Sequence, residues 1–163
     1  MKKYFVYLII YKKMSQLKYY KSMEFYSLLK NSGIPIMSQQ EFYYQFGVYP
    51  DIDYIIKTSN TILTFKLEFK VKSTDYITEE DTKKFINCTT NLSKSTGMKC
   101  FGYFIGNVKL SDKAYDILKK VKQNFGFCCD SEQTKLNRKI LKMLYNNQVF
   151  IYEQNGDCLM IDT

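Results

Sequence analysis

The segment from Thr61 to Lys72 constrains the fold more than any other part of the chain, because its side chains alternate strictly between apolar and polar. Successive side chains of a β-strand point to opposite faces of a sheet. The alternation therefore predicts a strand that carries its apolar residues on one face and its polar residues on the other. The apolar set is Leu63, Phe65, Leu67, Phe69 and Val71, and the polar set is Thr64, Lys66, Glu68, Lys70 and Lys72.

The residues before this strand predict three further elements. The apolar run Tyr4–Tyr11 is interpreted as a buried strand, and Ser15–Asn31 as a helix whose apolar stripe is interrupted by Glu24. After the helix, the aromatic stretch Glu41–Phe46 leads to a short strand, Asp51–Ile56.

The residues after it alternate between helices and strands. Thr78, followed by three acidic residues, predicts the start of a helix that ends at Gly97. Ser111 predicts the start of another helix, with Ala114, Leu118, Val121 and Phe125 turned inward. The remaining predictions are strands at Met98–Ile105 and Phe127–Cys129 and a helix at Ser131–Asn146. At the end of the chain, Gln148–Glu153 and Cys158–Asp162 are predicted to form a hairpin around a Gln-Asn-Gly-Asp turn.

This order of elements, β-α-β-β-β-α-β-α-β-α-β-β, is typical of an α/β protein. A length of 163 residues is near the commonest size of one domain, so we expect a single domain over residues 1–163.

Composition excludes several classes of function. The chain has no histidine, which rules out histidine bases and histidine-containing metal sites. Its five cysteines form no CxxC pair, so a disulfide framework or a zinc site is not expected. The run Tyr4–Tyr11 is too short to span a bilayer and precedes no signal-cleavage site, which predicts an intracellular protein, in the cytoplasm or nucleus, without a membrane partner.

Charge favours a polyanionic partner. The 24 Lys and Arg residues outweigh the 16 Asp and Glu residues by eight charges. A generic positive surface on a soluble protein would produce the same balance.

Four charged residues lie on the two predicted central strands, two before the turn that joins these strands and two after it. Asp51 and Asp53 share one face of the first strand, and Glu68 and Lys70 share one face of the second. Neighbouring carboxylates resist ionisation unless a cation neutralises them, and Mg²⁺ accepts hard oxygen ligands of this kind. The pattern favours a metal-dependent site in which Lys70 orients or deprotonates a water molecule.

The stretch Pro50–Asp53, followed by Glu68-Phe69-Lys70, resembles the signature of the PD-(D/E)xK, or restriction-endonuclease-like, nucleases. The likeness is closest to Mrr-like and archaeal Holliday-junction-resolvase-like members. Gly102–Gly106 looks like the family's strand of small residues, and Leu110–Ala114 leading to Phe127–Asp130 looks like its next helix and last strand. The resemblance covers roughly residues 15–130. It implies a nuclease-like core there, with a central mixed sheet flanked by helices, and leaves residues 131–163 as a C-terminal helix and hairpin appendage.

The resemblance also implies roles for individual residues. Asp53 and Glu68 would be the ligands of Mg²⁺, with Mn²⁺ as a substitute, and the backbone carbonyl of Phe69 would be a third ligand. Lys70 would be the catalytic lysine.

Two further acids match the family less directly. Asp51 fits another form of the motif, so the choice between Asp51 and Asp53 as main ligand stays open. Glu24 resembles an acid that some members add from the first helix, and it can equally be a tolerated residue at the edge of the apolar stripe.

The implied activity is hydrolysis of DNA by an endonuclease, and cutting both strands would favour a homodimer. Basic residues beside the site and on the last helix would contact phosphates: Lys66, Lys72, Lys135, Arg138, Lys139 and Lys142. The same helix face can instead be simply solvent-exposed.

Three alternatives remain at this stage. Asp51 and Asp53 can simply open a strand after Pro50. Glu68, Lys66 and Lys70 can then form a solvated strand face with weak cross-strand ion pairs. The chain can be a catalytically inactive nucleic-acid-binding or assembly subunit on the same fold. It can also be a small interaction protein whose basic surface meets a protein partner.

Overall fold

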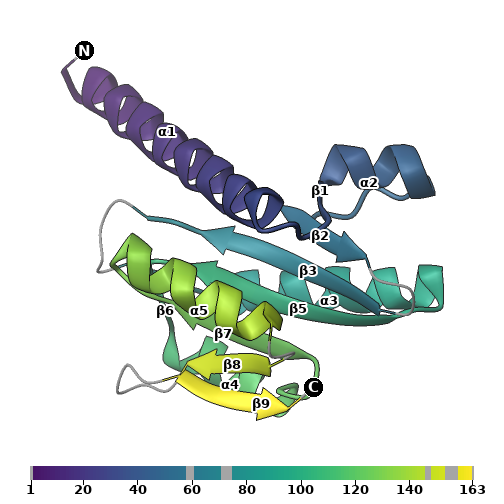
Figure 1. Ribbon diagram of the computed structural model, residues 1–163. Helices are drawn as coiled ribbons and strands as arrows, with labels where there is room; N and C mark the ends of the chain where they lie inside the picture. The colour runs from purple at the N-terminus through teal and green to yellow at the C-terminus, as the bar shows by residue number, and fades with distance from the viewer. Residues whose placement is uncertain (1, 58–60, 71–74, 146–147, 153–157, 163) are drawn as a thin grey trace.

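The computed structural model describes the backbone of residues 2–57, 61–70, 75–145, 148–152 and 158–162, and within these ranges the side chains of residues 16–144 except Met143. Across these residues the centre of the molecule is a five-stranded mixed sheet with helices on both faces (Figure 1). Its first three strands pair antiparallel and its last three pair parallel. In spatial order they are β1 (Ile36–Ser38), β2 (Tyr54–Lys57), β3 (Thr61–Glu68), β5 (Lys99–Gly106) and β7 (Phe125–Cys129).

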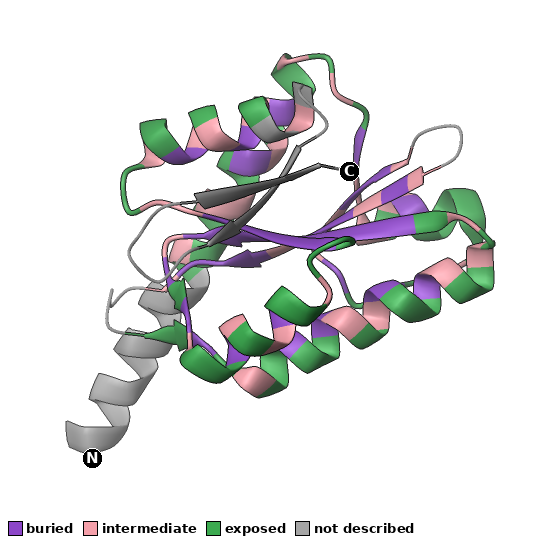
Figure 2. Ribbon diagram, turned by 90° about the horizontal axis from the view of Figure 1, so that it is seen from below, coloured by how far each residue is buried: buried purple, intermediate pink, exposed green. Residues whose placement is uncertain are grey.

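Two hydrophobic clusters bind the helices to the sheet. On one face, Phe25 of α1 (Lys2–Asn31) and Leu136 of α5 (Gln133–Tyr145) pack with Phe65 of β3. The other face is covered by α2 (Gln39–Phe46), α3 (Glu79–Thr96) and α4 (Asp112–Lys120). Figure 2 shows the buried sheet between the two layers. The helix assigned to the appendage, α5, therefore packs directly on the sheet.

Two small sheets complete the described fold. Strands β4 (Tyr76–Ile77) and β6 (Lys109–Leu110) pair in parallel. Strands β8 (Gln148–Tyr152) and β9 (Cys158–Asp162) form the predicted antiparallel C-terminal hairpin. The Gln-Asn-Gly-Asp turn expected between β8 and β9 lies outside the described residues.

The prediction of a strand that begins at Thr61 is confirmed, but β3 ends at Glu68, so Phe69 and Lys70 lie beyond it. The surroundings of β3 also differ from those expected of a half-exposed strand. It lies inside the sheet, between β2 and β5, and both of its faces are covered. Thr64, from the polar set, is fully buried, and its hydroxyl lies 3.0 Å from that of Thr89 on α3. The alternative of a solvated strand face is therefore wrong for Glu68, which is also buried, whereas Lys66 and Lys70 are half-buried and form ion pairs.

Local signals predicted the middle helices well. Thr78 caps α3 by accepting a hydrogen bond from the Asp81 backbone N–H, and Gly97 ends the helix with a φ of 68°. Ser111 caps α4 in the same way. The prediction of Phe125 on this helix is wrong, because α4 ends at Lys120 and Phe125 is the first residue of β7.

The prediction of a strand at Tyr4–Tyr11 and a helix beginning at Ser15 is wrong, because one helix, α1, runs through both. Residues 2–31 include neither Gly nor Pro, and extending an existing helix costs little once it is nucleated. Nothing therefore stops the helix at Ser15. Among the described residues, no helix has the length and apolarity that a membrane crossing requires.

The region before β3 also differs from expectation. The aromatic stretch Glu41–Phe46 is helical and belongs to α2, which a reciprocal capping box between Ser38 and Glu41 begins. The predicted strand Asp51–Ile56 is shorter than expected, since β2 starts at Tyr54. Asp51 and Asp53 therefore lie in the segment that leads into β2.

We predict that Gly106→Ala lowers the free energy of unfolding by about 1–3 kcal/mol, because a Cβ atom at this position would overlap the backbone carbonyl of Glu68. Urea unfolding measures the change. Asn91→Ala, at an exposed position of α3, is the control and should change stability by less than about 0.5 kcal/mol. Equal stability of the two variants would contradict the close approach of β5 to β3.

Candidate active site

The candidate site lies where β3 ends and the antiparallel β2 begins. Glu68 is the last residue of β3, and Asp53 immediately precedes β2. The backbone N–H of Asp53 donates to the carbonyl of Phe65 over 3.1 Å and extends the pairing of the two strands to this point. Asp53 is thereby fixed next to the end of β3.

The carboxylate of Asp53 is held by the backbone and by two lysines. Its Oδ2 accepts a hydrogen bond of 2.7 Å from the backbone N–H of Leu67. Lys66 Nζ lies 3.9 Å from Oδ2, and Lys18 Nζ, from α1, lies 3.7 Å from Oδ1. The acid therefore connects β3 to α1 across the end of the sheet.

The carboxylate of Glu68 is buried beside Lys70, whose Nζ lies 3.8 Å from Oε2. Burial raises the pKa of Glu68 above its ordinary value, and Lys70, Lys66 and Lys18 act in the opposite direction without cancelling it. Lys66 and Lys18 are the two cations beside Asp53. The structure thus brings Asp53, Glu68 and Lys70 into one network of charges.

The backbone of Lys70 is fixed by a residue that the sequence analysis missed. Asn107 accepts a hydrogen bond from the Lys70 N–H over 2.9 Å and donates one to the Lys70 carbonyl over 3.0 Å. Its own backbone N–H donates to the carbonyl of Glu68 over 3.2 Å. Asn107 follows β5 directly, so the parallel pairing of β3 and β5 places it there. An Asn two positions after the predicted strand Met98–Ile105 was the only sequence signal for it.

The donor set of this site fits a hard divalent cation. Asp53 and Glu68 supply carboxylate oxygens, and the carbonyl of Phe69 follows Glu68 in the chain. The described residues hold no group of three or more His, Cys, Asp or Glu side chains arranged around one metal position. Mg²⁺ commonly binds through one or two carboxylates and keeps waters or substrate phosphate in its other positions, so two carboxylates are compatible with it.

The other two predicted acids have different surroundings, although Asp51 shares Lys66 with this network. Asp51 is exposed and lines a separate pocket of about 100 Å³ together with Lys66 and Asp81. Glu24 is half exposed and pairs over 3.5 Å with Lys21 on its own helix. A helix turns by about 100° per residue, which directs Glu24 away from the side of α1 that buries Phe25.

The predicted phosphate-binding residues fall into different settings. Lys66 is part of the charged network at Asp53, and Lys72 lies outside the described residues. Lys139 is held by Asp130, with its Nζ 3.0 Å from Oδ2 and 3.0 Å from the carbonyl of Cys129. The exposed basic residues on α5 are Lys135, Arg138 and Lys142.

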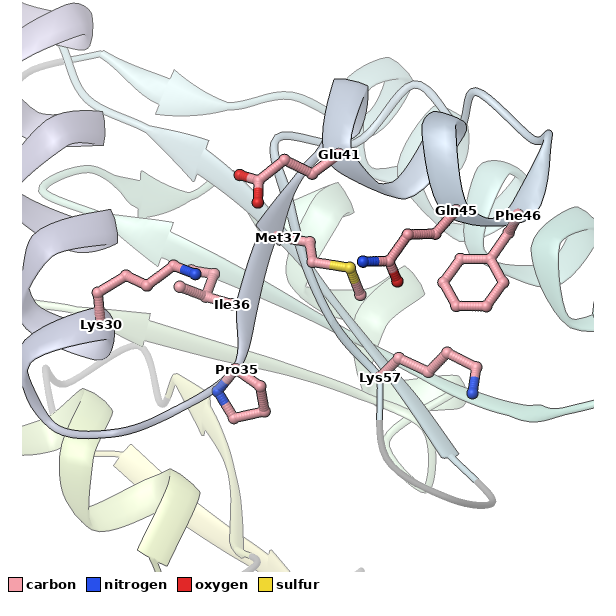
Figure 3. Close-up of a pocket in the computed structure, with 8 residues that line it drawn as sticks. All are labelled: Lys30, Pro35, Ile36, Met37, Glu41, Gln45, Phe46 and Lys57. Atoms are coloured by element: carbon pink, nitrogen blue, oxygen red, sulfur yellow. The ribbon is translucent and has the colours of Figure 1, made fainter.

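Two other depressions lie nearer α2. One, of about 260 Å³, has Asp53 in its wall. The other, of about 480 Å³, lies between the end of α1, β1 and α2 and is lined by side chains such as Lys30, Glu41 and Lys57 (Figure 3). The second pocket holds none of the predicted catalytic acids.

No protein-family model matches the chain, and no curated protein matches it. Among solved structures, the crystal structure of AF1548, a protein of unknown function, aligns with 81% of this chain and 68% of its own, with a TM-score of 0.52 and 11% identity. The MspJI restriction endonuclease, in complex with a 27-mer oligonucleotide, aligns with 76% of this chain, with a TM-score of 0.43 and 10% identity. This chain covers 27% of the MspJI chain. The likeness to AF1548 concerns the mixed α/β fold alone.

We predict that Asn107→Ala lowers the free energy of unfolding by about 1–3 kcal/mol, because it removes both side-chain hydrogen bonds to the Lys70 backbone. Chemical denaturation measures the loss. Asn87→Ala, at an exposed position of α3, should leave stability nearly unchanged. A loss no larger than that of Asn87→Ala would show that Asn107 does not fix this segment.

We predict that the ion pair of Asp130 and Lys139 stabilises the fold only above acidic pH. Burial alone would raise the pKa of Asp130, but hydrogen bonds from the Glu132 N–H and from Lys139 outweigh burial and lower the pKa. A folded-state pKa below the unfolded one adds stability at higher pH, and this stability is lost as pH falls through the folded value.

The measurement is urea unfolding of wild type and Asp130→Asn from neutral pH to pH 3. The stability advantage of wild type should be constant near neutrality and shrink below about pH 4. Asp116→Asn, an exposed acid on α4, controls for the removal of a negative charge. An advantage that does not vary with pH would contradict this assignment.

Proposed function

We propose that this chain has a restriction-endonuclease-like fold and is a metal-dependent endonuclease that hydrolyses DNA. The observation that carries the proposal is the burial of Glu68 next to Lys70 within a network that also includes Asp53. Glu68 ends the central strand β3, Lys70 follows that end by two positions, and Asp53 immediately precedes the neighbouring strand β2. The fold likeness to AF1548 supports the arrangement of the sheet.

Each residue has a role that follows from its contacts. Asp53 and Glu68 would hold Mg²⁺, with the Phe69 carbonyl as a further oxygen ligand. When bound, the metal ion supplies a more acidic water and stabilises negative charge on the phosphate. Lys70, whose backbone Asn107 fixes, orients the attacking water, and the Lys18 ammonium neutralises phosphate charge.

DNA is the proposed partner because its phosphates suit the surplus of positive charge. The exposed basic residues of α5, namely Lys135, Arg138 and Lys142, add to the positive surface. Cleavage of both strands of a duplex would use two copies of the site, and we include a homodimer in the proposal on this ground.

We predict that the protein cuts DNA in Mg²⁺ or Mn²⁺ and not in EDTA, and that Glu68→Gln and Lys70→Ala each lower the cleavage rate at least about 100-fold. Glu68→Gln removes a charged metal ligand at nearly constant volume, and Lys70→Ala removes the ammonium next to it. The assay follows linear, supercoiled, single-stranded and four-way-junction DNA on gels.

Glu80→Gln and Lys94→Ala, both at exposed positions on α3, are matched controls and should cut as wild type does. Circular dichroism of every variant checks folding. If wild type cuts none of the substrates, yet wild type and both site variants bind DNA equally, the endonuclease proposal is wrong and a binding subunit on this fold is favoured.

A further inference from the structure

A pocket of about 260 Å³ opens beside Asp53, on the side of the site that faces α2. Its walls come from α1, the β1–α2 junction and the segment before β2. Apart from Asp53, its lining side chains are uncharged amides and hydroxyls, among them Ser22, Gln39, Gln40 and Tyr49. The candidate active site and this pocket therefore share one wall.

The polar groups of the pocket are held by contacts with one another and with the backbone. Gln39 Nε2 donates to the carbonyl of Pro50 over 2.8 Å, and its Oε1 accepts from the Tyr49 hydroxyl over 3.4 Å. The Tyr54 hydroxyl donates to the carbonyl of Ser22 over 3.2 Å. Gln39 thus links α2 to the segment that carries Tyr49 and Asp53. A ligand at Tyr49 would therefore lie at a defined place beside the site.

The lining indicates what kind of ligand fits. Among the residues that the structure describes, no lysine or arginine lines this pocket, so the pocket offers no cation to bind a phosphate. Amide and hydroxyl groups can both donate and accept hydrogen bonds, as the edge of a nucleobase requires. The volume is slightly below the range of about 300–1,000 Å³ typical of pockets for drug-sized ligands, which suits a smaller planar group.

Tyr49 offers a surface for such a group. Its side chain is 61% exposed, and it is supported on one side by an edge-on contact with Tyr43, whose ring centre lies 6.0 Å away. Nucleobases stack on exposed aromatic rings of this kind with little dependence on sequence. Phosphates, in contrast, would bind near Lys18 and Lys66, the two lysines that form ion pairs with Asp53.

We propose that this pocket binds one nucleobase that has left the helical stack, next to the phosphate to be cut. This inference rests on the proposed endonuclease function and specifies its substrate class as DNA with an unpaired nucleotide. A paired base in a continuous duplex cannot reach the pocket, and extrusion costs least for a base that is already unpaired. The pocket selects for the unpaired base, while the lysines bind the backbone.

The test compares the binding of two DNA duplexes, one fully paired and one with a single bulged 2-aminopurine, by fluorescence anisotropy in EDTA. Wild type should bind the bulged duplex roughly tenfold more tightly and quench the 2-aminopurine emission as the base stacks. Tyr49→Leu, which removes the ring and the hydroxyl, should bring the two Kd values within twofold of each other and abolish the quenching. Its Kd for the paired duplex should stay within twofold of wild type.

Tyr76→Leu is the matched control, because Tyr76 is 55% exposed and lies on β4, outside the lining of the pocket. It should keep both the preference and the quenching. The pocket assignment is overturned if wild type shows no preference, or if Tyr49→Leu keeps it.

Cleavage of the same duplexes in Mg²⁺ separates the two claims. Metal-dependent cleavage without a preference for the bulge leaves the endonuclease function standing and refutes the nucleobase pocket. A preference that depends on Tyr49, without cleavage of either duplex, supports the pocket and refutes the endonuclease function.

Discussion

Strand β3 lies inside the sheet with both faces covered, and the rest of the structure depends on how its polar side chains are satisfied there. A buried polar group costs free energy unless a partner replaces the lost water. Thr64 meets this requirement with Thr89 and with the carbonyl of Phe101. Glu68 meets it only in part, since the neighbouring lysines do not offset the burial that raises its pKa. The same strand therefore contains Thr64, whose hydrogen bonds satisfy it, and Glu68, a buried acid whose negative charge is only partly compensated.

The partly compensated charge of Glu68 distinguishes this acid from Asp53. A carboxylate that packing alone required would be stabilised most simply by a close ion pair, yet Lys70 lies 3.8 Å away and the pKa of Glu68 remains raised. Asp53, by contrast, accepts a short backbone hydrogen bond and lies near two lysines. An additional cation between such acids would lower the cost of burying charge at Glu68. Surface ion pairs typically contribute about 0–1 kcal/mol each, whereas here Glu68 is buried and Asp53 is held by the backbone N–H of Leu67.

The elements predicted correctly are those with local signals. The alternation of β3, the Thr78 cap of α3 and the Ser111 cap of α4 each depend on residues within a few positions of one another. The same kind of signal was present for α2, because Ser38 and Glu41 have capping-box spacing, but the aromatic composition of the stretch obscured it. For Tyr4–Tyr11, composition suggested a strand, whereas continuity with the helix that follows determined the structure. The alternation of β3 could not predict that its polar face is covered. The same pattern of apolar and polar residues occurs whether a helix or solvent lies above the polar face.

The candidate site shows the same division between local and distant information. Glu68 and Lys70 are two positions apart, so the motif itself placed them, while the choice between Asp51 and Asp53 depended on where β2 begins. Lys18 and Asn107 are far from β3 in sequence. The parallel register that pairs Glu68 with Gly106 brings Asn107 to Lys70, and it requires a glycine at position 106 because the backbone of Glu68 leaves no room for a side chain. A single strand pairing thus fixes both the position of the acid and the support of the lysine. Packing between distant elements, rather than the motif alone, therefore sets the geometry of this site.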